Sequence, residues 1–131
     1  MTSSRQDYIS YKIERSAEIM EDAKLLAANK RWRSCVNRLY YSAFHLVNAL
    51  LFLDGINSKS HDGLKSKFLQ LYIKTNIIDI EYGKLYSRLI DWRQESDYSV
   101  FIDFEESDVA PIIEKVKKFN HILTQIINSK N

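Results

Sequence analysis

Apolar residues recur at steps of three and four along most of the 131-residue chain, which is the spacing of one face of an α-helix. Three glycines and one proline are too few for the many turns of an all-β fold. The pattern therefore predicts an all-α protein with five helices. Their expected ranges are about residues 4–29, 31–54, 63–73, 80–96 and 105–128.

The residues at the expected helix ends agree with these ranges. Thr2, Ser3 or Ser4 is a suitable N-cap for the first helix, because a hydroxyl accepts a hydrogen bond from a free backbone N–H. Gly55 is expected to end the second helix in the left-handed conformation, and Pro111 is expected near the first turn of the last helix. The first helix should bury a stripe formed by Ile9, Ile13, Ala17, Met20 and Ala27.

The second helix carries two stripes of residues. A core stripe with alternating steps of four and three is formed by Trp32, Val36, Leu39, Ala43, Leu46, Leu50 and Leu53. The opposite stripe is formed by Arg38, Tyr41, His45, Asn48 and Phe52. Tyr, His and Asn tolerate burial when they are hydrogen-bonded. This second stripe is therefore either a set of satisfied core groups or a surface that meets another helix, another subunit or a ligand.

The fourth helix places charged residues among leucines. At about 100° per residue, Arg93 and Asp97 fall in the same arc as Leu89 and Ile90. A guanidinium in that place must be paired, because an unpaired buried charge costs several kcal/mol. One reading is a buried clamp between Arg93 and Asp97 that fixes the helix end. The other is a pair that serves catalysis or ligand binding.

Composition narrows the class of protein. The 19 Lys and Arg residues nearly balance the 17 Asp and Glu, so bulk electrostatics indicate neither a nucleic-acid nor a membrane partner. Residues 1–131 are expected to form a single helical domain with one core. Cys35 is the only cysteine and is expected to be a buried, inert thiol. The N-terminal segment MTSSRQDYISYK lacks the apolar core of a signal peptide, so a cytoplasmic protein is expected.

Three segments taken together resemble one family. They are RLYYSAFHLVNALL in the second helix, SKSHDG after Gly55, and LYSRLIDWRQESDY in the fourth helix. Their combination and spacing resemble the small single-domain prokaryotic members of the HEPN superfamily. That resemblance implies an up-and-down bundle of four long helices with an additional short helix, commonly as a homodimer. It also implies a toxin-antitoxin setting, in which many members cut RNA without a metal and are encoded beside a minimal nucleotidyltransferase antitoxin.

The chain departs from the HEPN ribonuclease motif at one position. In that motif an Arg is followed after about four to six residues by a His, so that the Arg stabilises the scissile phosphate while the His moves a proton. Arg93 matches the Arg, but the positions for the His hold Tyr98, Ser99 and Val100. Activity would then require a histidine from elsewhere in the fold. His61 is the first candidate, since it matches a His of the family's segment after the second helix and lies in a polar loop.

Three functional hypotheses follow. The first is a HEPN module that binds a nucleotide, an RNA phosphate or a nucleotidyltransferase partner, with little catalysis of its own. The second is a metal-independent endoribonuclease in which Arg93 acts with His61, His45 or Tyr98. The third is a purely structural dimeric bundle. The candidate catalytic residues are Arg93 and His61, and the candidate binding residues are Arg38, Tyr41, His45, Asp97 and Tyr98.

The sequence contains no pattern typical of a metal-binding or cofactor-binding site. No two histidines have metal-ligand spacing, and Cys35 has no cysteine partner. The three glycines are isolated, so they form no phosphate-binding loop. We therefore expect neither a metal nor a cofactor.

Overall fold

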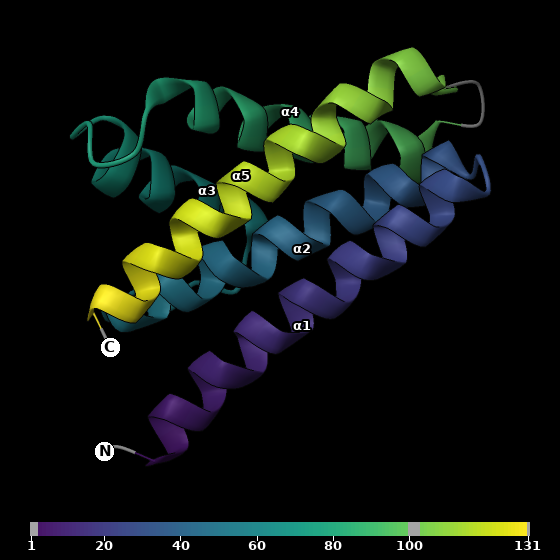
Figure 1. Ribbon diagram of the computed structural model, residues 1–131. Helices are drawn as coiled ribbons and strands as arrows, with labels where there is room; N and C mark the ends of the chain where they lie inside the picture. The colour runs from purple at the N-terminus through teal and green to yellow at the C-terminus, as the bar shows by residue number, and fades with distance from the viewer. Residues whose placement is uncertain (1–2, 100–102, 131) are drawn as a thin grey trace.

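The computed structural model describes residues 3–99 and 103–130 of the chain, and within these residues it is all-α (Figure 1). The five α-helices are α1 (Ser3–Ala28), α2 (Trp32–Leu53), α3 (His61–Phe68), α4 (Ile80–Tyr98) and α5 (Glu106–Lys130). A π-helical segment, η1 (Leu69–Ile73), continues directly from α3. The predicted fold class and number of helices are confirmed.

The four long helices run alternately up and down (Figure 1). Helix α2 lies at the centre, with α1 antiparallel along one side and α5 crossing it on another. Helix α4 packs against α2 as well, and α3 with η1 closes one end of the bundle (Figure 1). Because α2 contacts every other α-helix, side chains from opposite sides of this helix can reach different neighbours. No helix among the described residues is both long and apolar enough to span a membrane.

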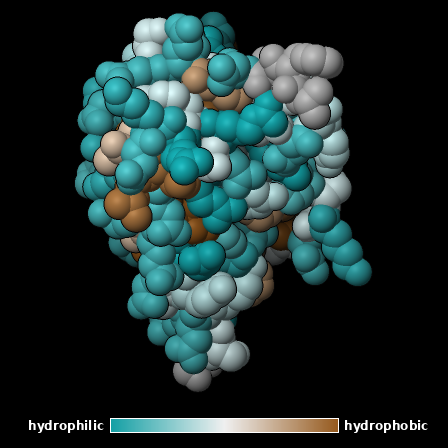
Figure 2. Space-filling view, turned by 90° about the vertical axis from the view of Figure 1, so that its right-hand side faces the viewer, coloured by the Kyte–Doolittle hydropathy of each residue, from teal (hydrophilic) through white to brown (hydrophobic). Residues whose placement is uncertain are grey.

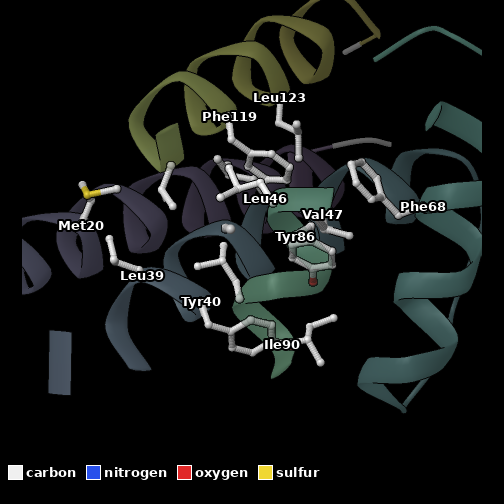
Figure 3. Close-up of a cluster of buried hydrophobic side chains, with 14 of the residues drawn as sticks. Met20, Leu39, Tyr40, Leu46, Val47, Phe68, Tyr86, Ile90, Phe119 and Leu123 are labelled. Carbon is white, nitrogen blue, oxygen red and sulfur yellow. The ribbon is translucent and has the colours of Figure 1, made fainter. Parts of the chain in front are cut away.

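The core is built from aliphatic residues of all five α-helices and a cluster of aromatic rings. Tyr86 of α4 and Phe119 of α5 stack with their ring centroids 5.8 Å apart and their planes 6° from parallel (Figure 3). Phe68 of α3 meets both rings edge-on. The predicted core stripe of α2 is confirmed, with Trp32 and Leu53 at its ends only partly buried. Cys35 is fully buried, and burial raises the pKa of its thiol to about 11, as expected for an inert residue.

Helix α1 differs from its predicted stripe. Ala17 is exposed and was wrongly expected to point inward, whereas Ser16 is buried. The Ser16 hydroxyl donates a 2.6 Å hydrogen bond to the carbonyl of Ser42 on α2, so its burial leaves no polar group unsatisfied. The serine in the stripe is tolerated because its partner is a backbone oxygen of the neighbouring helix. Of the proposed N-caps, Thr2 lies outside the described residues, and Ser3 and Ser4 lie within the helix.

Two further expectations about helix ends need correction. Helix α3 begins at His61 and not at residue 63, because the Ser60 side chain accepts a 2.8 Å hydrogen bond from the Gly63 backbone N–H and caps the helix. Pro111 is the sixth residue of α5, beyond the first turn. The carbonyl that it leaves unpaired belongs to the exposed Ser107, where water can replace the missing donor. Gly55 has φ +79° after α2, which confirms the left-handed end predicted there.

Seen from the end at which α4 ends and α5 begins, the surface is mostly hydrophilic (Figure 2). Hydrophobic residues occupy small separate areas on this face. This polar surface is relevant to function because most candidate site residues lie in α2 and at the C-terminal end of α4.

Candidate functional site

Arg93 is the centre of a group of side chains from α2, α3 and α4, which we term the Arg93 cluster. The group consists of Arg93, Asp97, Tyr40, Tyr41 and His61. The guanidinium carbon of Arg93 lies 5.5 Å from the ring centroid of Tyr40 and 5.6 Å from that of Tyr41. Both distances are within the range of cation–π attraction. The positive charge of Arg93 therefore contacts two aromatic rings, on the buried face of α4 that the helical pattern predicted.

The ion pair of Arg93 with Asp97 is close but incomplete. Arg93 Nε lies 3.3 Å from Asp97 Oδ2, yet within the described residues this nitrogen has no hydrogen bond of acceptable geometry. The Arg93 side chain is 17% exposed and that of Asp97 is 36% exposed. Arg93 is thus more open than the buried clamp requires, while Asp97 lies at the position needed to orient it.

His61 contacts the same cluster from the first position of α3. It does not lie in a loop as expected, because the Ser60 cap draws it into the helix. Its ring stacks on Phe44 with centroids 4.3 Å apart and planes 6° from parallel. Its Nδ1 atom shares a short hydrogen bond with the hydroxyl of Tyr40. Since Arg93 also contacts the Tyr40 ring, one buried tyrosine joins the two candidate catalytic residues.

The protonation states of this group follow from burial. Burial raises the pKa of Tyr40 to about 12, so the phenol keeps its proton at neutral pH and can donate it to His61 Nδ1. Burial and the charge of Arg93 lower the pKa of His61 below its ordinary value, which favours the neutral ring. A neutral His61 that accepts at Nδ1 carries its own proton on Nε2. In that form it is a hydrogen-bond donor at Nε2.

Arg38 extends the Arg93 cluster along α2. Its guanidinium lies 5.3 Å from the Tyr41 ring centroid and donates to the Asn37 side chain from two nitrogens. Tyr41 thus lies within cation–π distance of both Arg38 and Arg93. An open recess of about 480 Å³ adjoins Arg38 and the end of α4. Its lining residues are Leu26, Arg33, Ser34, Asn37, Arg38, Ser96 and Asp97.

The rest of the second α2 stripe turns toward α1. Lys12 Nζ lies 3.2 Å from Nδ1 of His45, and the Tyr8 hydroxyl donates a 2.7 Å hydrogen bond to Asn48. Burial and the nearby cations, Lys12 first, lower the pKa of His45 to about 4. His45 is therefore a neutral acceptor held by α1. No contact among the described residues joins it to Arg93.

Tyr98 is the last residue of α4, and its side chain is 82% exposed. Within residues 3–99 and 103–130, none of the hydrogen bonds, ion pairs or ring contacts links it to Arg93 or His61. It lies next to Asp97 in sequence but projects into solvent. The fold therefore brings together Arg93, His61, Tyr41, Arg38 and Asp97, and leaves His45 and Tyr98 apart from them.

Sequence reasoning missed Tyr40 and Phe44, which hold His61. Both belong to the segment RLYYSAF, where Tyr40 and Phe44 are four residues apart and so share one face of α2. That spacing was a usable signal for an aromatic face. The contact of His61 with this aromatic face could not be predicted without knowing how α3 packs against α2. No group of three or more potential metal ligands occurs in the part of the chain that the structure describes.

An up-and-down helical bundle with a half-buried arginine between aromatic rings of its central helix defines a small all-α protein with a localised cationic site. The model of the HEPN domain family matches residues 9–126, and the chain belongs to that family. The family resemblance noted in the sequence is confirmed.

Relatives of similar length agree with this assignment. The chain is 35% identical over 125 residues to a "UPF0332 protein" of Thermotoga maritima, covering 95% of each sequence. It is 30% identical over 119 residues to the "Putative toxin MJ0142" of Methanocaldococcus jannaschii, covering 91% of this chain and 81% of the relative. A second protein of that organism, "Putative toxin MJ0605", is 32% identical over 102 residues, or 78% of this chain and 76% of the relative.

Proposed function

We propose that the chain is a toxin-type HEPN module that binds a phosphate-bearing ligand, a nucleotide or an RNA, at the Arg93 cluster, with little catalysis of its own. The observation that carries this proposal is the setting of Arg93, whose side chain is 17% exposed and only partly paired with Asp97. A guanidinium held in this way presents planar donors that match the oxygens of a phosphate.

The neighbouring groups support recognition of an anion. A neutral His61 that accepts a hydrogen bond from Tyr40 would offer its Nε2–H as a second donor. Arg38 adds a second positive charge, with its guanidinium 5.3 Å from the centroid of the Tyr41 ring. These groups together provide two positive charges and a directed hydrogen-bond donor for a phosphate.

The same geometry supports the proposal that the chain has little catalytic activity. Cleavage of RNA by its own 2′-hydroxyl requires a base that removes the hydroxyl proton while the oxygen attacks phosphorus and the 5′-oxygen leaves. A His61 ring that carries its proton on Nε2 and accepts from Tyr40 at Nδ1 has no free nitrogen for that task. The proposal therefore assigns His61 to ligand binding.

A metal-independent endoribonuclease is the second candidate. It is favoured by the contact of both Arg93 and His61 with Tyr40, which assembles an Arg–His pair from separate segments. In this alternative, substrate binding would shift the His61 proton to Nδ1, with Tyr40 as acceptor, so that Nε2 becomes the base. Induced expression separates the two functions: growth arrest that Arg93→Ala and His61→Ala both relieve supports the ribonuclease.

A partner enzyme is part of the proposal. The toxin names of the two archaeal relatives favour a toxin-antitoxin setting. We propose a homodimer and a nucleotidyltransferase antitoxin as partners of this chain. The exposed Tyr98 hydroxyl is a suitable acceptor for a nucleotidyl group, because nothing in the described structure covers it. In that reaction its oxygen would bond to the α-phosphorus of a nucleoside triphosphate, the phenol would lose its proton, and pyrophosphate would leave.

The binding proposal is tested with a local reporter. Adenosine monophosphate and a short single-stranded RNA are titrated separately while the NMR signals of the His61 ring are followed. At least one of the two is expected to shift these signals saturably in the wild type and not in Arg93→Ala. Arg31→Ala is the control, because Arg31 is an exposed arginine outside the Arg93 cluster. Unchanged His61 signals with both ligands would refute the proposed site.

A further inference from the structure

A groove of about 330 Å³ lies between α4 and α5, and we term it the α4/α5 groove. It is lined by Glu81, Tyr82, Lys84, Leu85, Arg88, Ile112, Lys115 and Lys118. None of these residues belongs to the Arg93 cluster. On α4, Lys84 and Arg88 lie about 140–180° around the helix axis from Arg93, as the helical repeat requires. The α4/α5 groove is thus a separate surface from the Arg93 cluster.

The charge around the groove differs from that of the whole chain. Four of its lining residues are cations and one is an acid, whereas the chain has 19 cationic and 17 acidic residues. None of the four cations forms an ion pair among the described residues. Glu114 pairs at 3.0 Å with Lys117, and not with the neighbouring Lys118. Like charges that face each other without partners are unfavourable, so an anion bound there would stabilise the arrangement.

Cationic side chains from both α4 and α5 line the groove. Lys84 and Arg88 are four residues apart on α4, and Lys115 and Lys118 are three residues apart on α5, so each pair lies on one helix face. Between the pairs the groove contains the buried side chains of Leu85 and Ile112.

One edge of the groove is aromatic. The half-buried Tyr82 ring lies there, and its centroid is 6.3 Å from that of Phe119. The only acid, Glu81, is next to Tyr82, and burial together with Glu81 raises the pKa of the phenol. The groove therefore has a cationic rim, an apolar floor and one aromatic edge.

We propose that the α4/α5 groove is a second anion site, which takes phosphate groups through Lys84, Arg88, Lys115 and Lys118. Two sources carry this chemistry: a small molecule with linked phosphates, or the backbone of a single-stranded RNA. The apolar floor and the aromatic edge suit the less polar part of such a ligand. The proposal does not rest on the function assigned to the Arg93 cluster. The alternative is a solvated rim, in which the lysine stems only cover Leu85 and Ile112.

The test compares two double variants with equal charge change. Lys84→Gln/Lys118→Gln alters the groove, and Lys67→Gln/Lys74→Gln removes two exposed lysines elsewhere. Inorganic pyrophosphate and a short oligoribonucleotide with a 5′-hydroxyl are titrated separately, with calorimetry for affinity and the Tyr82 ring signals as the local NMR reporter. Circular dichroism and thermal unfolding verify that each variant is folded. Arg93→Ala is included to separate this site from the Arg93 cluster.

We expect the groove variant to weaken binding at least about tenfold, since a hydrogen bond to a charged group contributes about this factor. The charge-matched control and Arg93→Ala should keep the Tyr82 response. Loss confined to pyrophosphate supports a small phosphate ligand, and loss confined to the oligonucleotide supports an RNA backbone. If Tyr82 responds to neither ligand, or if the two double variants lose affinity equally, the groove is a solvated surface and the proposal is wrong.

Discussion

Replacing Arg93 by alanine separates a structural clamp from an open site, because the two predict different losses of stability. A buried and fully paired arginine would leave Asp97 uncompensated when removed, at a cost of about 3 kcal/mol or more. The contacts in the structure predict a smaller loss of stability. The partly exposed ion pair contributes about 0–1 kcal/mol, and each cation–π contact contributes about 0.5–1 kcal/mol. We therefore expect Arg93→Ala to lower the free energy of unfolding by about 2 kcal/mol.

Thermal and urea unfolding measure this loss. For a chain of this length, 1 kcal/mol corresponds to about 3–5 °C in melting temperature, so a decrease of about 6–10 °C is expected. Arg88→Ala is the matched control on the same helix, because Arg88 is exposed and unpaired among the described residues. Its effect should stay within about 0.5 kcal/mol.

The second measurement on Arg93→Ala is its response to added ligand. The NMR shift of the His61 ring on addition of nucleotide or RNA should disappear in Arg93→Ala while the protein remains folded. Arg93→Lys should recover part of the stability but little of the binding, because an ammonium lacks the planar donors of a guanidinium. A loss of about 3 kcal/mol or more would leave only the clamp. A variant as stable as the wild type that still binds would refute both accounts.

Three other predictions concern oligomeric state, modification and pH. Sedimentation should give about twice 15.4 kDa, with Arg38 and Tyr41 at a dimer interface; a monomer at all concentrations would contradict this. Co-expression with a nucleotidyltransferase encoded beside this chain should raise the intact mass by one nucleotidyl group, and Tyr98→Phe should prevent it. The pKa of His45 is about 4 in the folded protein and about 6.5 when unfolded, so the unfolded chain binds the extra proton between these values. Stability should fall as pH decreases from about 6.5 to about 4, and His45→Gln should flatten that slope relative to the wild type, as measured by urea unfolding at each pH.

The positions of side chains around each helix could be predicted because they depend only on the local repeat. Arg93 was expected among leucines of α4, and it is found against the rings of Tyr40 and Tyr41. The core stripe of α2 follows from the same rule. Errors arose where a polar side chain had a tertiary partner, as for Ser16, whose hydrogen bond to the Ser42 carbonyl makes it a core residue.

The composition of the Arg93 cluster could be predicted only in part, because its members come from separate segments. A local signal did exist for the start of α3, since Ser60 followed by Asp62 is typical of a helix N-terminus. Recognising it would have placed His61 in the helix. The contact of His61 with Tyr40 and Phe44 depends on how α3 packs against α2, and no sequence spacing encodes that packing.

Comparison of Arg93 with Arg33 indicates which features of an arginine leave it free to bind a ligand. Arg33 donates 2.9 Å hydrogen bonds to the carbonyls of Ser96 and Ser99, so its donors are used to hold the end of α4. The guanidinium of Arg93 contacts the Tyr40 and Tyr41 rings and pairs with Asp97, and it donates no hydrogen bond to a carbonyl of the described residues. The aromatic pair Tyr40–Tyr41 therefore allows a charge to remain half-buried without consuming the hydrogen bonds that a phosphate needs. Asp97 lies 3.3 Å from Arg93 Nε without forming a hydrogen bond of acceptable geometry, so we assign ligand binding to Arg93 and a structural role to Arg33.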